Sequence, residues 1–461
     1  HQNVFVGDYA GQATADVGYA VAVGHGAMGS GAVTNAADGT IAIGVNALEV
    51  LISGQRNTAI GTSALTTETV GDYCVAVGYE ALTAQVGVDG TVGNTAVGYN
   101  AGATVTSGIN NTLIGYLAGD GFAAESGNTF IGASAGGGAI NGADDCVAIG
   151  KDALAGAATV DGTVAIGKDA LTALTSGAGN TAVGYTALTT NVDGGYNTAV
   201  GYESLNLFEA DAGNHGDNTA VGYRAGKFVS TGTGQTFIGM NAGVGITGTR
   251  LTGDNNTAIG RQAGLELEGA AHSNTFVGTN AGSTTEAGVE NTCIGVMCVA
   301  EDDTATNQIV IGNNVTGTAD NAVHIGNDTS HIRCDFNADQ TWDASSDRRQ
   351  KKDIEESELG LDFINDLKPS KYRHKSPSEF PEEWSAYNAD DKEPMGGSDK
   401  YYYGFIAQEV KESIDKYDAS DYGAWNADGD GRQRVSREQF VVSLVKAVQE
   451  LTAKVEALEA K

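Results

Sequence analysis

Proline, paired cysteines and cationic residues are scarce in this 461-residue sequence, and each scarcity excludes a class of protein. With only 4 prolines beside 66 glycines, the chain is neither a collagen nor a Pro-rich linker. The five cysteines are an odd number without CxxC or Cys/His spacing, which predicts small buried side chains rather than a disulfide framework or a zinc site. The sequence contains no run of 18 apolar residues, so no membrane insertion is predicted.

Acidic residues dominate the charge, with 58 Asp and Glu against 26 Lys and Arg and a net charge of −32. A nucleic-acid partner is excluded, because nucleic acids bind proteins that neutralise phosphates with Lys and Arg. We predict no cofactor and no metal, since Asn426–Gly431 imitates the start of an EF-hand loop but has Arg437 at its twelfth position and favours a β-turn. His1 opens no signal segment, so we expect a mature or truncated chain with an attachment region upstream.

A repeat fills residues 1–335. Nineteen segments that end in Val-Gly or Ile-Gly align with one another, and their glycines are 17 residues apart in eleven steps, 18 to 21 in six and 14 in the last. A fixed period of this kind predicts a solenoid of stacked coils. The glycines are Gly7, Gly24, Gly44, Gly61, Gly78, Gly98, Gly115, Gly132, Gly150, Gly167, Gly184, Gly201, Gly222, Gly239, Gly260, Gly278, Gly295, Gly312 and Gly326.

Each position of the repeat, written as in Asn94–Gly102, has a physical role. Val or Ile before the glycine predicts a short half-buried strand, and we expect two four-residue strands per coil with residues such as Val97 inside. The glycine permits a turn where a Cβ would clash or positive φ is needed. Asn stands four residues before the glycine in eleven copies, which predicts a ladder bonded amide to amide along the axis. Longer steps, as from Gly201 to Gly222, predict loops on one edge as the contact surface.

The repeat resembles the head of trimeric bacterial adhesins, a left-handed β-roll, and the repeats of phage tail fibres. Adhesin heads favour a shorter unit, which only the step from Gly312 to Gly326 matches, so a wider coil is expected. One column of such small coils buries too little apolar surface to offset backbone ordering, which by itself predicts association of several chains. The expected fold is therefore an all-β trimeric β-solenoid, or β-roll, of about nineteen 17-residue repeats.

Charged and aromatic residues become frequent after the repeat, and we place a domain boundary near residue 335. The motifs Ser346–Ile354, Ile364–Pro369 and Tyr403–Val410 follow in order and resemble the endosialidase-type intramolecular chaperones. The resemblance implies that residues 336–461 form a small α+β domain that trimerises the fibre and then cuts itself off. A coiled-coil helix is expected at 436–461. Its heptads hold Val at a and Leu at d, which alone favours a coiled coil of two helices, whereas the resemblances imply three. The heptad residues are Val441, Leu444, Val448, Leu451, Val455 and Leu458.

The resemblance also implies a catalytic dyad in which Lys351 activates Ser346, five residues before it. This chemistry needs a neutral amine, and desolvation beside Arg348 and Arg349 would lower the pKa of Lys351. The scissile bond is then Ser345–Ser346, with Ser345 as the competing nucleophile. A chaperone can lose its peptidase and keep its folding role, so self-cleavage is the only catalysis expected, with none on external substrates.

These features predict the distal part of a phage tail fibre: a homotrimer in the virion, assembled in the host cytoplasm, that binds upstream fibre or tail proteins and a host-surface glycan or protein. A glycan-degrading tailspike is one alternative, because this chaperone family also follows endosialidases. The unbroken repeat leaves it no room for a catalytic domain, although Asp144–Asp145 or Asp302–Asp303 could lie on loops. A bacterial trimeric adhesin is the other alternative, but the anchors of such adhesins are C-terminal, where a charged chaperone helix is expected here.

Overall fold

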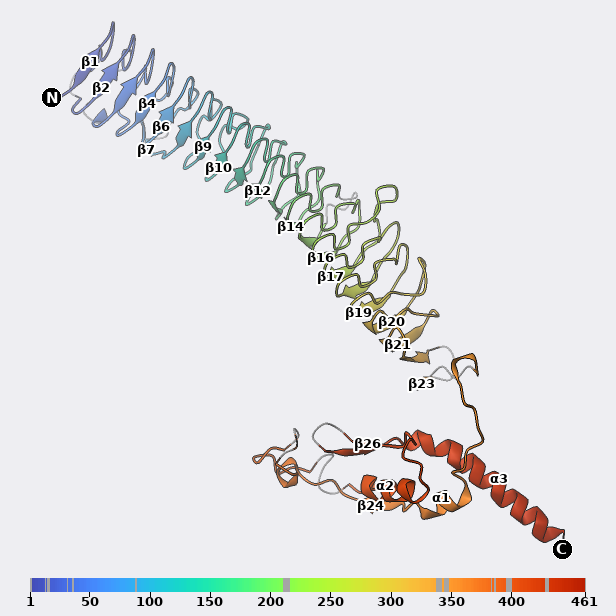
Figure 1. Ribbon diagram of the computed structural model, residues 1–461. Coiled ribbons are helices and arrows are strands. Elements are labelled where there is room, and N and C mark those ends of the chain that lie inside the picture. Colours follow the sequence, from blue (N-terminus) through green and yellow to red (C-terminus); the bar gives the residue numbers. More distant parts are fainter. Residues whose placement is uncertain are drawn as a thin grey trace. The chain divides into compact units, whose positions relative to one another are not determined.

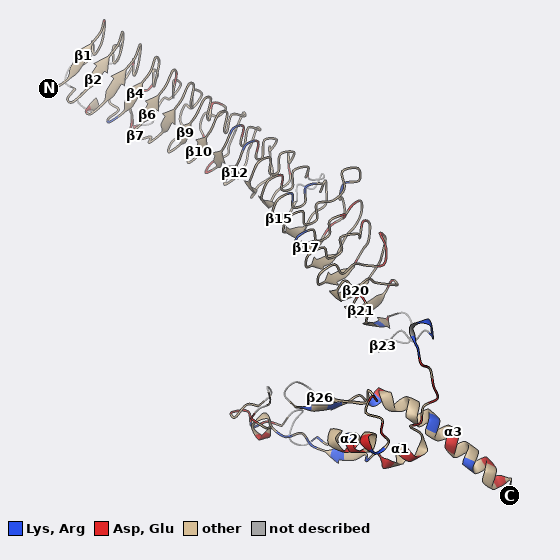
Figure 2. Ribbon diagram, viewed as in Figure 1, with Lys and Arg blue, Asp and Glu red and all other residues tan. Residues whose placement is uncertain are grey.

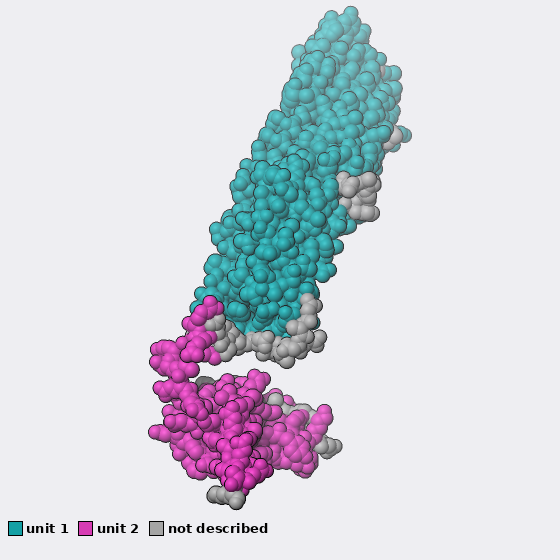
Figure 3. Space-filling view, turned by 90° about the vertical axis from the view of Figure 1, so that its right-hand side faces the viewer, with its two compact units in different colours: residues 1–345 teal, residues 346–461 magenta. Residues whose placement is uncertain are grey.

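The computed structural model describes residues 2–460, apart from positions 13, 15–16, 31, 35–36, 88, 210–215, 337–341, 344–347, 383, 385–386, 395–399 and 428–430. The chain divides into two compact units, residues 1–345 and 346–461 (Figure 3). A β-solenoid followed by a small domain with a C-terminal helix is confirmed. The predicted boundary near residue 335 precedes the division between the units and stays a prediction.

Unit 1 is a stack of coils in which one short strand from every repeat pairs in parallel with the strand of the next coil (Figure 1). The register aligns repeat with repeat, so that Val97 pairs with Ile114. Each of these strands ends directly before the glycine of its repeat or, in β20 and β21, runs through it. These strands are β1 Val4–Val6, β2 Val21–Val23, β3 Ile41–Ile43, β4 Thr58–Ile60, β6 Val75–Val77, β8 Thr95–Val97, β9 Thr112–Ile114, β10 Thr129–Ile131, β11 Val147–Ile149, β12 Val164–Ile166, β13 Thr181–Val183, β14 Thr198–Val200, β15 Thr219–Val221, β16 Thr236–Ile238, β17 Thr257–Ile259, β18 Thr275–Val277, β19 Thr292–Ile294, β20 Ile309–Asn313 and β21 Ala322–Asn327.

Four further strands belong to unit 1. The antiparallel strands β22 (His331–Asp335) and β23 (Trp342–Asp343) extend the long sheet beyond β21. The two-residue strands β5 (Gly71–Asp72) and β7 (Gly90–Thr91) pair in parallel in a separate small sheet. Most coils contain a single three-residue strand and turns, so the expectation of two four-residue strands per coil is wrong.

The core of each coil holds the middle residue of the strand, not the valine that precedes the glycine. In β8 the Ala96 side chain is fully buried, whereas Val97 is 36 % exposed on the outer face of the sheet. The prediction that Val97 is interior is therefore wrong, because burial of the middle residue turns both of its neighbours outward. The small residue three positions after the glycine, as at Ala101, is buried in the same core.

Core volume is shared between the strand and a position six residues later. Where the middle residue of the strand is Ala148, the later position is the buried Leu154. Where the middle residue is Phe130, the later position is Gly136, and a Cβ there would lie 2.3 Å from the phenyl ring. A large side chain at one position thus requires a small one at the other, because both fill the same core.

The glycine of each repeat permits both a turn and close stacking. Gly98 has φ +145°, and a Cβ there would lie 2.2 Å from the carbonyl oxygen of Gly115 in the next coil. Side chains are excluded by this distance as well as by the backbone conformation. The predicted role of the glycine is confirmed.

Buried asparagines connect successive coils mainly through the backbone. The Asn94 Oδ1 accepts the backbone N–H of Asn111 at 2.8 Å, and its Nδ2 donates to the Gly108 carbonyl at 2.7 Å. The ladder is therefore present, but most of its bonds run from side chain to backbone, because each turn leaves peptide groups that only the next coil can pair. Direct amide-to-amide bonds join Asn197 to Asn180, Asn274 to Asn256 and Asn291 to Asn274.

Unit 2 packs three helices around one small core. The helices are α1 (Leu361–Asp366), α2 (Ala407–Lys416) and α3 (Phe440–Glu459), and α1 contacts both of the others. The helix predicted at 436–461 is thus present as α3. The core consists of Leu359, Phe363, Leu367, Val410, Ile414, Ala424 and Phe440. Among the described residues of the unit, two antiparallel strand pairs and three 3-10 turns accompany the helices: β24 Ser370–Tyr372 with β25 Tyr402–Gly404, β26 Trp425–Ala427 with β27 Gln433–Val435, η2 Arg348–Gln350, η3 Pro377–Glu379 and η4 Arg437–Gln439.

Candidate functional site

The predicted catalytic dyad stands at the start of unit 2. Ser345 and Ser346 lie outside the described residues. Lys351 follows η2, and its backbone N–H donates to the Arg348 carbonyl at 3.1 Å. The side chains of Lys351, Arg348 and Arg349 are exposed in the single chain. The described residues therefore do not bury Lys351 as a neutral amine requires, and the dyad stays a prediction.

The second motif, Ile364–Pro369, holds α1 against the end of α2. The Asp366 carboxylate accepts hydrogen bonds from Lys416 Nζ at 2.5 Å and from the Tyr417 hydroxyl at 2.6 Å. These two bonds, first that of Lys416, lower the pKa of Asp366 below its ordinary value. Just before the motif, the buried Phe363 ring meets the Tyr417 ring edge-on, 5.7 Å between centroids. The motif thus fixes the position of α1.

The third motif, Tyr403–Val410, leads from β25 into α2. Its Val410 side chain is 1 % exposed in the core, and the Phe405 ring lies 5.2 Å from the Phe440 ring of α3. Both contacts tie α2 to the rest of the unit. The three motifs therefore mark a folded unit, in which the second and third supply packing rather than reacting groups.

The sequence reasoning missed Glu450, which lies on α3 and caps α1. Its carboxylate accepts the backbone N–H of Leu361 at 2.9 Å, at the N-terminus of α1. A negative side chain is stabilising there, because the first N–H groups of a helix have no partner within it. Gly360 leaves the space for this contact, since a Cβ would lie 2.3 Å from Glu450 Oε1. The residues are 89 positions apart, so no local pattern reveals the pair.

Residues 346–418 match the family described as the chaperone of endosialidase. All three motifs lie inside this match, which begins at Ser346. A search of curated proteins found no match for the chain. The chaperone domain and the long solenoid fit a tail fibre or tailspike with a C-terminal chaperone, as predicted. The family points to phage tail proteins and to trimer formation.

The last helix of the chaperone domain exposes its apolar heptad side chains. Leu451 on α3 is 49 % exposed, and Leu458 near its end is 69 % exposed. The opposite side of α3 is buried through Phe440 and Ala447. In the single chain the heptad face therefore lies in water, which is unfavourable for apolar side chains unless another helix covers it.

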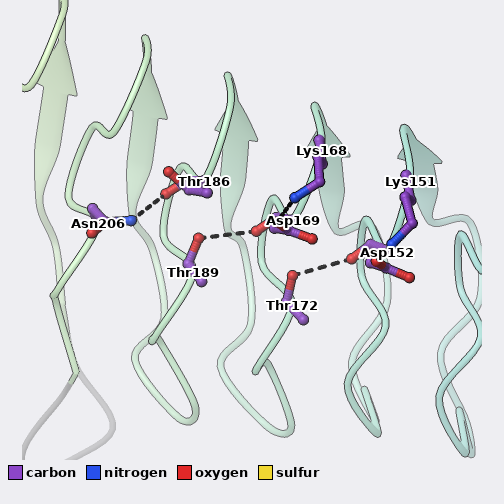
Figure 4. Close-up of polar contacts among 8 residues, drawn as sticks. All are labelled: Lys151, Asp152, Lys168, Asp169, Thr172, Thr186, Thr189 and Asn206. Atoms are coloured by element: carbon purple, nitrogen blue, oxygen red, sulfur yellow. Dashed lines mark hydrogen bonds and ion pairs between the residues drawn. The ribbon is translucent and has the colours of Figure 1, made fainter.

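Polar side chains connect neighbouring coils on the surface of the solenoid (Figure 4). Thr172 Oγ1 donates to the Asp152 carbonyl at 3.1 Å, and Thr189 Oγ1 repeats this contact with the Asp169 carbonyl at 3.0 Å. Lys151 pairs with Asp152, and one coil later Lys168 pairs with Asp169. Such exposed ion pairs contribute little stability. They do neutralise two of the few cations on this surface.

Tyrosines follow the repeat glycine in two groups of three successive coils. Their rings stack with centroids 5.1 to 5.4 Å apart and remain 42 to 56 % exposed. Lys168 Nζ lies 5.3 Å from the ring of the first tyrosine in the second group. Each group presents a row of phenol edges along the solenoid axis. The groups are Tyr79, Tyr99 and Tyr116, and Tyr185, Tyr202 and Tyr223.

The five cysteines are all buried and unpaired, as predicted. Within the part of the chain that the structure describes, no three His, Cys, Asp or Glu side chains come together in a way that could hold a metal ion. In the same part, no helix combines the length and apolar character needed to cross a bilayer.

Proposed function

We propose that this chain is the distal part of a trimeric phage tail fibre, whose chaperone domain assembles three copies and then separates by cutting the Ser345–Ser346 bond. One coincidence carries the proposal. The chaperone match begins at Ser346, and the two compact units divide at the same bond. A cut there would leave the whole solenoid on one side and the whole chaperone domain on the other.

The chemistry of the cut balances with Ser346 as nucleophile and Lys351 as base. The Ser346 hydroxyl forms an ester with the Ser345 carbonyl carbon, the peptide C–N bond breaks, and Lys351 carries the hydroxyl proton to the departing Ser346 amine. Water then hydrolyses the ester and leaves a carboxylate on Ser345. Lys351 must first be neutral. Lys351 is exposed in the single chain, so we propose that trimer assembly supplies the surroundings in which it acts as the base.

Mass spectrometry of the purified chain tests this proposal. We expect fragments of 345 and 461 − 345 = 116 residues. Ser346→Ala and Lys351→Ala should each leave an uncut chain that still trimerises, because they remove reacting groups and no core packing. Lys352→Ala is the matched control and should be cut normally. Cleavage that survives Ser346→Ala but is lost in Ser345→Ala would show that Ser345, not Ser346, is the nucleophile. A cut at another bond would refute the dyad.

We further propose that the outer surface of the fibre binds a host-surface glycan or protein. The exposed tyrosine rows support this, because phenol edges offer both hydroxyl hydrogen bonds and apolar contact. The test measures binding to a panel of bacterial lipopolysaccharides and capsular polysaccharides and to whole cells. Binding that weakens in Tyr202→Ala supports the proposal, and binding to none of these probes contradicts it.

One carboxylate of each acidic pair that could have served a glycan-degrading tailspike accepts a backbone hydrogen bond. Asp144 Oδ1 accepts the backbone N–H of Ser126 at 2.7 Å, and Asp302 Oδ1 accepts that of Thr304 at 2.9 Å. These bonds give both carboxylates a structural role. They favour the binding fibre over the tailspike.

A further inference from the structure

Two positions of the repeat are uniform in a way that the coil itself does not require. The residue directly before the glycine is Val or Ile in all nineteen copies, and the residue three before it is Thr, Val or Ile in all nineteen. Neither position ever carries a charge. By contrast, the residue directly after the glycine varies in chemistry and includes Asp8, Lys151 and Tyr202. We name the side chains of the two uniform positions the outer strip.

The outer strip lies on the surface of the single chain. In strands such as β8, both positions flank the buried middle residue, so their side chains point away from the core. Val97 is 36 % exposed, Ile294 is 41 % exposed and Val6 is 57 % exposed. Because the strands pair in register, these side chains form straight rows, as from Val77 to Val97 to Ile114. The result is a continuous β-branched surface along the coils.

Charge restricts what can cover this surface. Residues 1–345 hold 8 Lys and Arg against 33 Asp and Glu, a net charge of 8 − 33 = −25, and Figure 2 shows how few cations the solenoid carries. Copies of unit 1 therefore repel one another through most of their surface. The uncharged outer strip is the face on which close approach costs no like-charge contact. A second copy that lies parallel to the first presents the same strip, so each coil of one copy meets the same coil of the other.

We propose that the outer strip is the face through which copies of this chain contact one another in the fibre. The inference rests on the proposed trimer and names its contact along the solenoid. The strip is large enough, because its exposed Val and Ile side chains offer on the order of 1,000 Å² per copy, about what one partner contributes to a stable interface. Eighteen steps between strands extend it over roughly 85 Å.

Disulfide cross-linking tests the contact. Val97→Cys places a thiol on the outer strip, and Thr95→Cys places a second one in the same coil. Ser107→Cys is the matched control, because Ser107 is an exposed residue of that coil outside the strip. The native cysteines are buried and supply a low background. Each variant is purified, its mass is measured by light scattering, and it is oxidised with a copper catalyst before non-reducing electrophoresis.

We expect covalent dimers of the chain from Val97→Cys and Thr95→Cys and none from Ser107→Cys. A trimer in which Ser107→Cys cross-links while both strip variants stay uncoupled would overturn the contact face and leave the proposed function standing. A monomeric unsubstituted protein would overturn the proposed trimer, and the contact with it.

Discussion

Replacement of Gly98 by alanine should disrupt the solenoid at one coil, by an amount that follows from two observations. The φ of +145° places Gly98 in a region that side chains rarely adopt, which costs about 1–3 kcal/mol. The added Cβ would also lie 2.2 Å from the Gly115 carbonyl oxygen, so the next coil must move away. That movement loosens the 2.8 Å bond from the Gly115 N–H to the Val97 carbonyl, worth about 1 kcal/mol. The total is about 2–4 kcal/mol per chain.

Two other glycines separate the cost of the backbone conformation from the cost of the lost stacking contact. Gly162 has φ +65° with no atom within 4 Å of a built Cβ, so its alanine variant should cost only about 1–2 kcal/mol. Gly248 has open space and no positive φ, so Gly248→Ala should be neutral or slightly stabilising. A long solenoid need not unfold in one step, so the readout is amide hydrogen exchange of β8 and β9 beside the thermal onset. Equal exchange in Gly98→Ala and Gly248→Ala would refute the stacking argument.

Two further predictions concern the ends of the described units. His324 is buried, and its burial lowers its pKa to about 4, with smaller contributions from His331 and Arg333. The unfolded chain takes up the proton at a higher pH, near 6.5. The last coil should therefore lose stability as pH falls from about 6.5 to about 4. Phe237 occupies the equivalent position of another coil, so His324→Phe should be tolerated and should remove this pH dependence of amide hydrogen exchange. An unchanged pH profile in the variant would show that His324 is not its cause. In α3, Leu451→Asp should weaken trimers in light scattering, whereas Thr452→Asp on the neighbouring position should not, and equal effects would contradict the heptad assignment.

The repeat made the solenoid predictable, because one self-similar unit fixes the register of every coil at once. Which strand residues point inward was harder to read. Thr95, Ala96 and Val97 alternate in a way that suits either face, and side-chain size alone favours Val97 for the interior. The available signal was the exchange between Ala148 with Leu154 and Phe130 with Gly136, since only positions that share a core compensate each other's volume.

The chaperone domain was predictable from its motifs, while the geometry of its site was not. Asp366 and Val410 lie in two of these motifs, and their contacts pack the unit. The cap that Glu450 gives to α1 depends on a contact across 89 positions, which no local pattern encodes. Lys351 is exposed in the single chain, so the residues of its own motif do not supply the surroundings that the proposed base needs.

The mass of the purified particle tests the central claim most directly. The outer strip and the heptad face of α3 are both apolar surfaces that one chain leaves in water, and three copies around one axis would cover both. Light scattering of the uncut Ser346→Ala protein should therefore give about three times the chain mass of 47.0 kDa at all concentrations tested. A monomer or a stable dimer would contradict the account.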